Sequence, residues 1–198
     1  INAFGDKDVT RVTPVIGLEQ EYFLVDKNDF LNREDLMLTG ETVIGALPPK
    51  GQELETHYFG HIPEKVQAFM SEVNNELWEL GVYAKTEHNE VAPGQFELAP
   101  IYANCNVAVD QNQLIMEVLQ KVAMKHDLVC LLHEKPFKGV NGSGKHNNYS
   151  LVTNTGVNVF DPGKNPHENI QFLTFVSAFI KALDTHPELI RMYSSCPG

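Results

Sequence analysis

Four glutamates stand at positions from which their carboxylates can bind a divalent cation. Glu19 and Glu21 lie in Val12–Asp26, where polar and apolar residues alternate, a pattern that predicts a strand. Side chains two residues apart in a strand point to the same face, about 7 Å apart. Charged residues are also common on solvent-facing strands. The pair therefore indicates either a metal site or an ordinary exposed face.

The other two glutamates flank a predicted turn. Pro93-Gly94 suits a type II turn, and if these residues form a two-residue hairpin loop, Glu90 lies opposite Glu97. Directly opposed like charges are destabilising, and a divalent cation would remove the repulsion. A solvated turn with two unrelated glutamates is the alternative. His88 shares the strand face of Glu90 and either supports such a site or has no part in it.

A glycine-rich run, Asn141–His146, follows later in the chain. Its two glycines let backbone N–H groups approach an anion, although the spacing fits neither a P-loop nor a dinucleotide-binding loop. His146 opens the next predicted strand and is either a metal ligand or an ordinary polar residue. Four glutamates and one histidine favour a divalent-metal phosphoryl-transfer site over a zinc site, which would need more nitrogen or sulfur ligands.

The elements that must position these residues follow from hydrophobic periodicity. We expect a helix from Pro63 to a cap at Gly81, a helix with Asp110 as its N-cap, and a largely buried helix over 166–183. A short helix follows Pro187. The expected buried face of the second helix comprises Leu114, Ile115, Val118, Leu119 and Val122. Further strands are expected over 82–87, 87–103, 128–132 and 147–153, with no regular element in 27–60.

This order of elements predicts an α+β fold with a largely antiparallel sheet covered by long helices. Strict alternation of strands and helices is missing, which argues against a Rossmann-type fold.

Composition narrows the possible partners. The 198 residues carry a net charge of −11 and no basic run, which argues against nucleic acid and anionic membranes as partners. No apolar stretch is long enough to span a bilayer. Cys105, Cys130 and Cys196 are far apart in the sequence, so we expect free thiols in a reducing, cytoplasmic compartment.

Three motifs, in this order and spacing, resemble the catalytic domain of glutamine synthetase. They are Gly17–Phe23 (GLEQEYF), Asn89–Glu97 (NEVAPGQFE) and Asn141–His146 (NGSGKH). The residues His57–Gly60 and Cys105–Gln113 are most similar to the long bacterial type III class. The resemblance covers residues 12–198 and implies part of a glutamine synthetase/guanidino kinase-like catalytic domain. Residues 1–11 are expected to be a loose N-terminal segment.

The resemblance also implies roles for the metal ligands. Glu21, Glu90 and Glu97 match the family's ligands to one Mg²⁺ or Mn²⁺ ion. Glu19 and His146 match ligands to a second ion, whose third ligand belongs to a later motif of the family.

Substrate contacts are implied in the same way. Asn141 and Gly142 match the positions that contact the substrate glutamate. Asn148 and Ser150 match positions near the nucleotide, where the family has a histidine in place of Asn148. An asparagine can donate and accept hydrogen bonds there but cannot become cationic.

The implied activity is ATP-dependent ligation of ammonia to the γ-carboxylate of glutamate through γ-glutamyl phosphate, giving glutamine, ADP and phosphate. The implied partners are these substrates and further copies of the chain in a large ring. A γ-glutamyl-amine ligase of the same family, a non-catalytic structural relative and a structural metal-binding domain of unrelated fold are alternatives. The chain begins at Ile1 and ends at Gly198 without the family's β-grasp domain, flap glutamate and phosphate-binding arginines. We therefore expect a fragment that is inactive alone, with the catalytic groups outside it.

Overall fold

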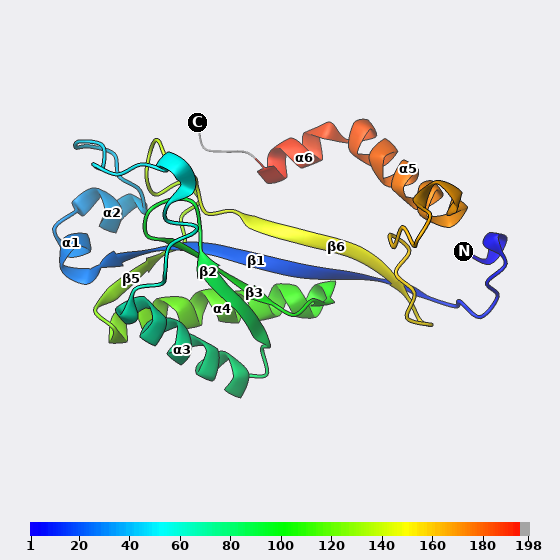
Figure 1. Ribbon diagram of the computed structural model, residues 1–198, viewed down its shortest axis with the longest axis horizontal. Helices are drawn as coiled ribbons and strands as arrows, with labels where there is room; N and C mark the ends of the chain where they lie inside the picture. Colours follow the sequence, from blue (N-terminus) through cyan, green and yellow to red (C-terminus); the bar gives the residue numbers. More distant parts are fainter. Residues whose placement is uncertain (195–198) are drawn as a thin grey trace. The chain divides into compact units, whose positions relative to one another are not determined.

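The long strand β1 (Val12–Asp26) organises the sheet in the computed structural model, which describes residues 1–194, with side chains for 1–192 (Figure 1). The strand has the predicted bounds. Within the described residues the strand order is β2-β3-β1-β4, and β5 and β6 also pair with β1. The other strands are β2 (Ala84–Asn89), β3 (Gln95–Pro100), β4 (Ala103–Asn104), β5 (Leu128–Leu131) and β6 (Lys145–Thr153). The pairs β1–β3, β1–β5 and β2–β3 are antiparallel, which confirms the predicted α+β class.

The chain divides into two compact units, each described here by itself. The site unit is Gly17–Asn148, and the terminal unit comprises Ile1–Ile16 and the residues from Tyr149 onward. Every glutamate and histidine singled out above belongs to the site unit.

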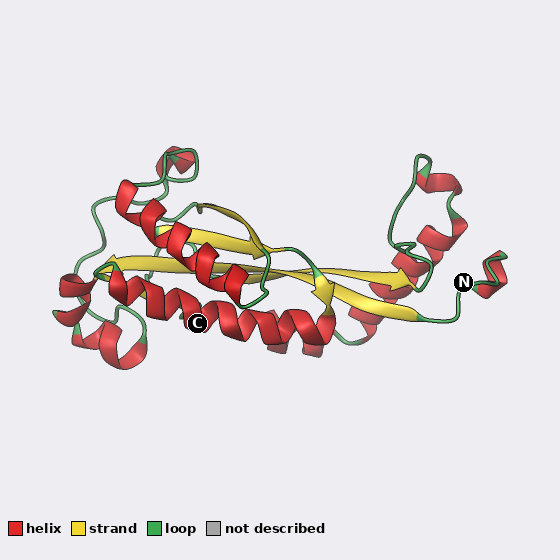
Figure 2. Ribbon diagram, turned by 90° about the horizontal axis from the view of Figure 1, so that it is seen from below, coloured by secondary structure: helices red, strands yellow, loops and turns green. Residues whose placement is uncertain are grey.

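Two long helices cover one face of the sheet in the site unit. Helices α3 (Glu64–Glu79) and α4 (Cys105–Lys125) lie side by side against the strands (Figure 2). Their apolar stripes enclose the side chains of Tyr22, Phe96 and Leu98, all nearly inaccessible to solvent. Tyr22 and Leu98 thus turn toward the helices, as the alternation in β1 and β3 predicts, and the glutamates beside them turn to the other face.

The second face of the sheet is covered near the end of β1 by two short helices that periodicity did not predict. These are α1 (Lys27–Leu31) and α2 (Glu34–Thr39), and a short 3₁₀ helix, Glu53–Glu55, follows them. Asp26 caps α1 by accepting a hydrogen bond from the Asn28 N–H. Such short helices show no hydrophobic period, so packing of Leu36 against Phe23 and its neighbours stabilises them instead.

Helix α4 begins earlier than its sequence indicates. Asn104, not Asp110, is the N-cap, because Ala108 and Asn112 are buried and tertiary packing extends the helix N-terminally. Leu114 was predicted to be buried, but it is 39% exposed, whereas the other four predicted positions are buried. The α3 prediction is confirmed: Pro63 is the N-cap and Gly81, at φ +78°, follows the C-cap.

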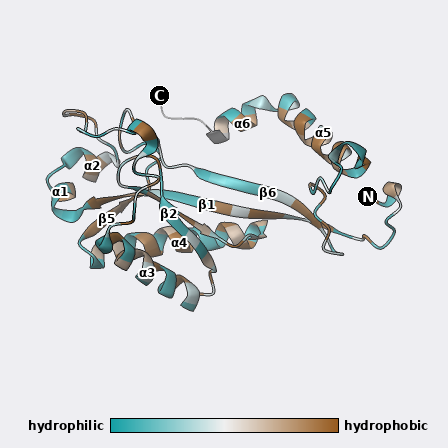
Figure 3. Ribbon diagram, viewed as in Figure 1, coloured by the Kyte–Doolittle hydropathy of each residue, from teal (hydrophilic) through white to brown (hydrophobic). Residues whose placement is uncertain are grey.

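The terminal unit contains two 3₁₀ helices, Asn2–Phe4 and Pro166–Glu168, with α5 (Ile170–Thr185) and α6 (Pro187–Ser194). The Asn154 side chain accepts hydrogen bonds from the backbone N–H groups of Thr10 and Arg11. The prediction that the helix near 166–183 is largely buried is wrong, because no residue of α5 is buried in the described structure. Figure 3 shows that hydrophobic residues make up much of this helix. Periodicity identifies an apolar helix but not whether another element covers it.

Two further predictions concern cysteines and membranes. Cys105 and Cys130 are free thiols, as predicted, and Cys196 lies outside the described residues. In the described part of the chain, none of the helices combines the length and the apolar character that a membrane crossing requires.

Candidate functional site

The hairpin that carries Glu90 and Glu97 has a different register from the one predicted. His88, not Glu90, lies opposite Glu97, and the Glu90 N–H donates to the Gln95 carbonyl at 2.9 Å. The loop is therefore Val91–Gly94 and not Pro93-Gly94 alone. The type II turn itself is present, since the Gln95 N–H donates to the Ala92 carbonyl at 3.0 Å and Gly94 has φ +74°. A type II turn splays the flanking strands, so the chain adds residues before pairing begins.

The opposed glutamates are Glu21 and Glu97, which pair across β1 and β3. Both are almost fully buried, at 7% and 6% exposed. Burial raises the pKa of Glu97, and the negative charge of Glu19 adds to this effect. The negative charges of Glu90 and Glu21 raise the pKa of Glu97 further, so repulsion reaches Glu97 both from its own hairpin and from the distant strand β1.

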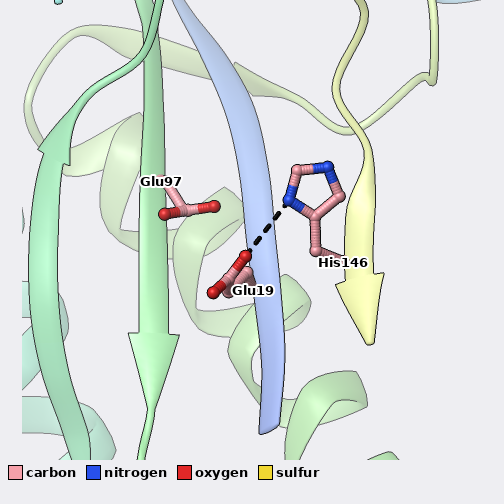
Figure 4. Close-up of side chains that lie close together, drawn as sticks. All are labelled: Glu19, Glu97 and His146. Atoms are coloured by element: carbon pink, nitrogen blue, oxygen red, sulfur yellow. Dashed lines mark hydrogen bonds and ion pairs between the residues drawn. The ribbon is translucent and has the colours of Figure 1, made fainter. Parts of the chain in front are cut away.

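A first group of potential ligands is formed by Glu19, Glu97 and His146. One ligand atom of each lies within 4.8 Å of the others, and the side chains converge from β1, β3 and β6 (Figure 4). His146 Nδ1 lies 3.1 Å from Glu19 Oε2. Three predicted metal-ligating residues thus come together from three strands, and the outer two, Glu19 and His146, are more than a hundred residues apart in the sequence.

A second group, His88, Glu90 and Glu97, also has ligand atoms within 4.8 Å of one another. His88 Nε2 lies 2.7 Å from Glu97 Oε2, and Nδ1 lies 2.9 Å from the Asn89 carbonyl. Burial alone would lower the pKa of His88, but that carbonyl and the carboxylates of Glu97 and Glu90 reverse the effect, so the pKa is raised. Burial also raises the pKa of Glu90, and the charge of Glu21 contributes. Glu97 is common to both groups.

We call the carboxylates of Glu19, Glu21, Glu90 and Glu97, with the imidazoles of His88 and His146, the carboxylate cluster. His88 was left open by the sequence, and its place beside Glu97 follows from the corrected hairpin register. The register of the pairing between β2 and β3 determines the position of His88. A one-residue shift of that register would move His88 to the opposite face of the sheet.

Glu21 is held by the glycine-rich loop. The Gly144 N–H donates to Glu21 Oε2 at 2.7 Å, and the Gln95 amide donates to the same oxygen at 3.3 Å. Glu21 Oε1 lies 3.9 Å from His146 Nε2. The anion that this loop binds through Gly144 is therefore a carboxylate of the protein, which is fixed at the edge of the cluster.

The predicted substrate-binding and nucleotide-binding residues lie in three different parts of the structure: the glycine-rich loop, the side of the carboxylate cluster and the terminal unit. The Asn141 side chain accepts a hydrogen bond from Gln52 Nε2 at 3.0 Å, and the Gly142 carbonyl accepts one from the Gln95 amide at 3.0 Å. Asn148 Nδ2 donates to Glu19 Oε1 at 2.8 Å, beside the cluster. Ser150 belongs to the terminal unit, where its hydroxyl is hydrogen bonded to Asn158.

A neighbouring loop fixes the end of β2. The buried Asn89 amide donates to the His57 carbonyl at 3.1 Å and the Gly60 carbonyl at 2.9 Å. His57 Nδ1 in turn lies 2.6 Å from the Glu90 carbonyl. The stretch His57–Gly60 thereby holds the backbone that presents Glu90.

The donor set of the cluster suits a hard divalent cation. Carboxylate oxygens are the ligands that Mg²⁺ and Mn²⁺ prefer, and imidazole is accepted by Mn²⁺. Ligands at about 2.1 Å from an octahedral ion lie at most about 4.2 Å apart, so groups within 4.8 Å need only small movements to bind one. The buried, opposed pair of Glu21 and Glu97 gives the same indication, because a cation would neutralise it.

Residues 2–187 match the glutamine synthetase catalytic domain, and the chain belongs to this family. It is 58% identical over 194 residues to a glutamine synthetase of Butyrivibrio fibrisolvens, which covers 98% of this chain and 28% of the relative. It is 51% identical to the type-3 glutamine synthetase of Dictyostelium discoideum, covering 95% and 26%, respectively. The chain thus spans about a quarter of the length of these curated relatives. The predicted resemblance, including the type III class, is confirmed.

Solved structures agree on the fold. A structure described as apo GmaS without ligand has a TM-score of 0.55 and 24% identity, covering 75% of this chain and 32% of that one. A second, described as a novel glutamine synthase homolog, has a TM-score of 0.55 and 19% identity, with coverage of 78% and 31%. The predicted fold class is confirmed by these neighbours.

Proposed function

We propose that this chain supplies the metal-binding part of a glutamate–ammonia ligase site. The reaction joins ammonia to the γ-carboxylate of glutamate through γ-glutamyl phosphate and yields glutamine, ADP and phosphate. The observation that carries the proposal is the convergence of Glu19, Glu97 and His146 from three strands, with Glu21 opposite Glu97. Membership of the glutamine synthetase family supports it.

The cluster's role in this proposal is to hold two Mg²⁺ or Mn²⁺ ions, with Glu21, Glu90 and Glu97 around one and Glu19 and His146 around the other. Such ions neutralise phosphate oxygens during phosphoryl transfer. The protein's own part is to direct the carboxylates. The Gly144 N–H holds one oxygen of Glu21, and the Asn148 amide holds one oxygen of Glu19.

The substrates are glutamate, ATP and ammonia. The γ-carboxylate oxygen of glutamate attacks the γ-phosphorus of ATP, and ADP leaves. Ammonia then attacks the acyl carbon of γ-glutamyl phosphate, phosphate leaves, and one proton is lost to give the amide. Asn141 and Gly142 are the proposed contacts to glutamate, and Asn148 lies where a nucleotide contact is proposed. Further copies of the chain complete the assembly in a large ring.

The test is an assay of the full protein for glutamine and ADP formation from glutamate, ammonia and ATP with Mg²⁺ or Mn²⁺. Glu97→Gln should lower the rate at least about a hundredfold, because removal of a ligand or its partners costs on this scale or more. Glu79→Gln is the matched control: Glu79 is exposed near the end of α3, and its substitution should leave the rate unchanged.

Two results would contradict the proposal. The first is full activity of Glu97→Gln. The second is product formed with a small primary amine in strong preference to ammonia, which would assign the protein to the γ-glutamyl-amine ligases of the family.

A further inference from the structure

The side chain of Gln95 joins three parts of the site unit that are distant in sequence. It is 1% exposed, and its amide nitrogen donates to Glu21 Oε2 on β1 at 3.3 Å and to the Gly142 carbonyl at 3.0 Å. Its amide oxygen accepts from the Ala92 N–H in the hairpin turn at 3.3 Å. Each hydrogen-bonding group of a buried amide requires a partner, and here the partners are a carboxylate, a loop and a turn.

We propose that Gln95 is a positioning residue that fixes the carboxylate of Glu21 and the glycine-rich loop in one arrangement. This inference rests on the proposed function insofar as Glu21 is a metal ligand and Gly142 belongs to the glutamate-binding loop. Nothing in the sequence motif itself assigns a role to Gln95.

The geometry shows how the positioning works. Both donors that hold Glu21, the Gln95 amide and the Gly144 N–H, bind the same oxygen, Oε2. Oε1 lies toward His146, 3.9 Å from its Nε2. The carboxylate is thereby prevented from rotating, and one oxygen is directed to the cluster. Outer hydrogen-bond partners of metal-ligating carboxylates commonly have this orienting role.

The same amide also controls the loop. Gly142 is tightly placed, since a Cβ atom there would lie 2.3 Å from the Glu134 carbonyl oxygen. The Ser143 N–H donates to this carbonyl at 2.8 Å, so one side of the loop is fixed by Glu134 and the other by Gln95. Displacement of Glu21 would therefore reach the loop through the Gln95 amide at Gly142 as well as directly through the Gly144 N–H.

The experiment measures Mn²⁺ affinity by calorimetry, without any assay of activity. Gln95→Met replaces the amide with a side chain of similar size that has no N–H donor. We expect its dissociation constant for Mn²⁺ to rise 10- to 100-fold, the range typical for loss of an outer-shell partner. Hydrogen exchange of the amides of 142–144 should become faster at the same time.

Two control variants separate positioning from general destabilisation. Glu79→Gln alters an exposed residue near the end of α3, away from the carboxylate cluster. Leu98→Val loosens the core on the other face of β3. Both should keep Mn²⁺ affinity within about twofold of the wild type, even if thermal stability falls.

Wild-type affinity in Gln95→Met, or an equal loss in Leu98→Val of matched stability, would overturn the inference. If Gln95→Met does not fold, hydrogen exchange of the wild type is decisive: Mn²⁺ should slow exchange at Ala92 and at 142–144, and unchanged exchange at saturating Mn²⁺ would refute it. A wild-type protein that binds Mn²⁺ but forms no glutamine would refute the proposed function alone.

Discussion

Replacement of Glu87 by glutamine should make the protein more stable above neutral pH. Glu87 is on β2 opposite Leu98, so its side chain points toward the helices and not toward the carboxylate cluster. Asn74 Nδ2 on α3 donates to its Oε2 at 3.2 Å, whereas Glu87 Oε1, Asn74 Oδ1 and the Tyr22 hydroxyl are buried without a hydrogen-bond partner among the described residues. This environment favours an uncharged carboxyl group.

The magnitude follows from the pKa. Burial raises the pKa of Glu87 from 4.5 to about 8, with the Asn74 hydrogen bond acting in the opposite direction. Between these values the folded protein binds more protons than the unfolded chain, so stability is greatest below the unfolded pKa and falls as pH rises. At about 1.4 kcal/mol per pH unit, the loss between about pH 5 and pH 8 is about 4 kcal/mol, and stability is then level.

The assay is urea unfolding at several pH values, followed by the fluorescence of Trp78, the only tryptophan of the chain. Trp78 lies on α3 and its indole N–H donates to the Ala84 carbonyl of β2 at 3.0 Å, so it reports on the two elements that enclose Glu87. As pH rises, the free energy of unfolding of Glu87→Gln should fall much less than that of the wild type. Its difference from wild type isolates this group from His88, Glu90 and Glu97, which also titrate.

Exposed Glu79→Gln is the control and should follow the wild type at each pH. The reasoning is refuted if the stability difference between Glu87→Gln and wild type changes by less than about 1 kcal/mol between about pH 5 and pH 9, because Glu87 would then be ionised in the folded protein as it is in the unfolded chain.

Two predictions concern the cluster and its loop. Mn²⁺ at a hundred times its dissociation constant should stabilise the wild type by about 2.7 kcal/mol, and Glu97→Gln should lose most of this increment in thermal unfolding; equal increments in both would contradict the site. Gly142→Ala should accelerate hydrogen exchange across the glycine-rich loop and destabilise the protein by about 1–3 kcal/mol, because the new Cβ would lie 2.3 Å from the Glu134 carbonyl oxygen. Unchanged exchange and stability would show that the loop has room for a methyl group.

The elements with strong periodicity were predictable from the sequence. The bounds of β1 and the apolar stripe of α3 follow directly from alternation and from three- and four-residue spacing. The start of α4 and the presence of α1 and α2 do not follow from residue spacing. At these places the burial of Ala108 and Leu36 decides the structure, and local propensity does not. The residues around these positions do not indicate which distant residues they will contact.

The candidate site was predictable in its residue types but not in its pairing. A two-residue Pro93-Gly94 loop predicted that Glu90 lies opposite Glu97, yet the glutamate opposite Glu97 is Glu21. The error arose from the loop length, since a type II turn does not by itself fix the register of a hairpin. The role of Gln95 depends on contacts with β1 and the glycine-rich loop, which no spacing within the hairpin can indicate.

Glu97 is a proposed ligand of one ion, and its carboxylate also lies within 4.8 Å of the ligand atoms of Glu19 and His146, so the two proposed ions should not bind independently. Whichever ion binds first reduces the negative charge that attracts the second, so a titration should give two unequal stepwise binding constants and not two equal ones. Changes at Glu19 should affect mainly one step and changes at Glu90 mainly the other, whereas a change at Glu97 should weaken both. The ratio of the two stepwise binding constants therefore measures how strongly the Glu97 side chain couples the binding of the two ions.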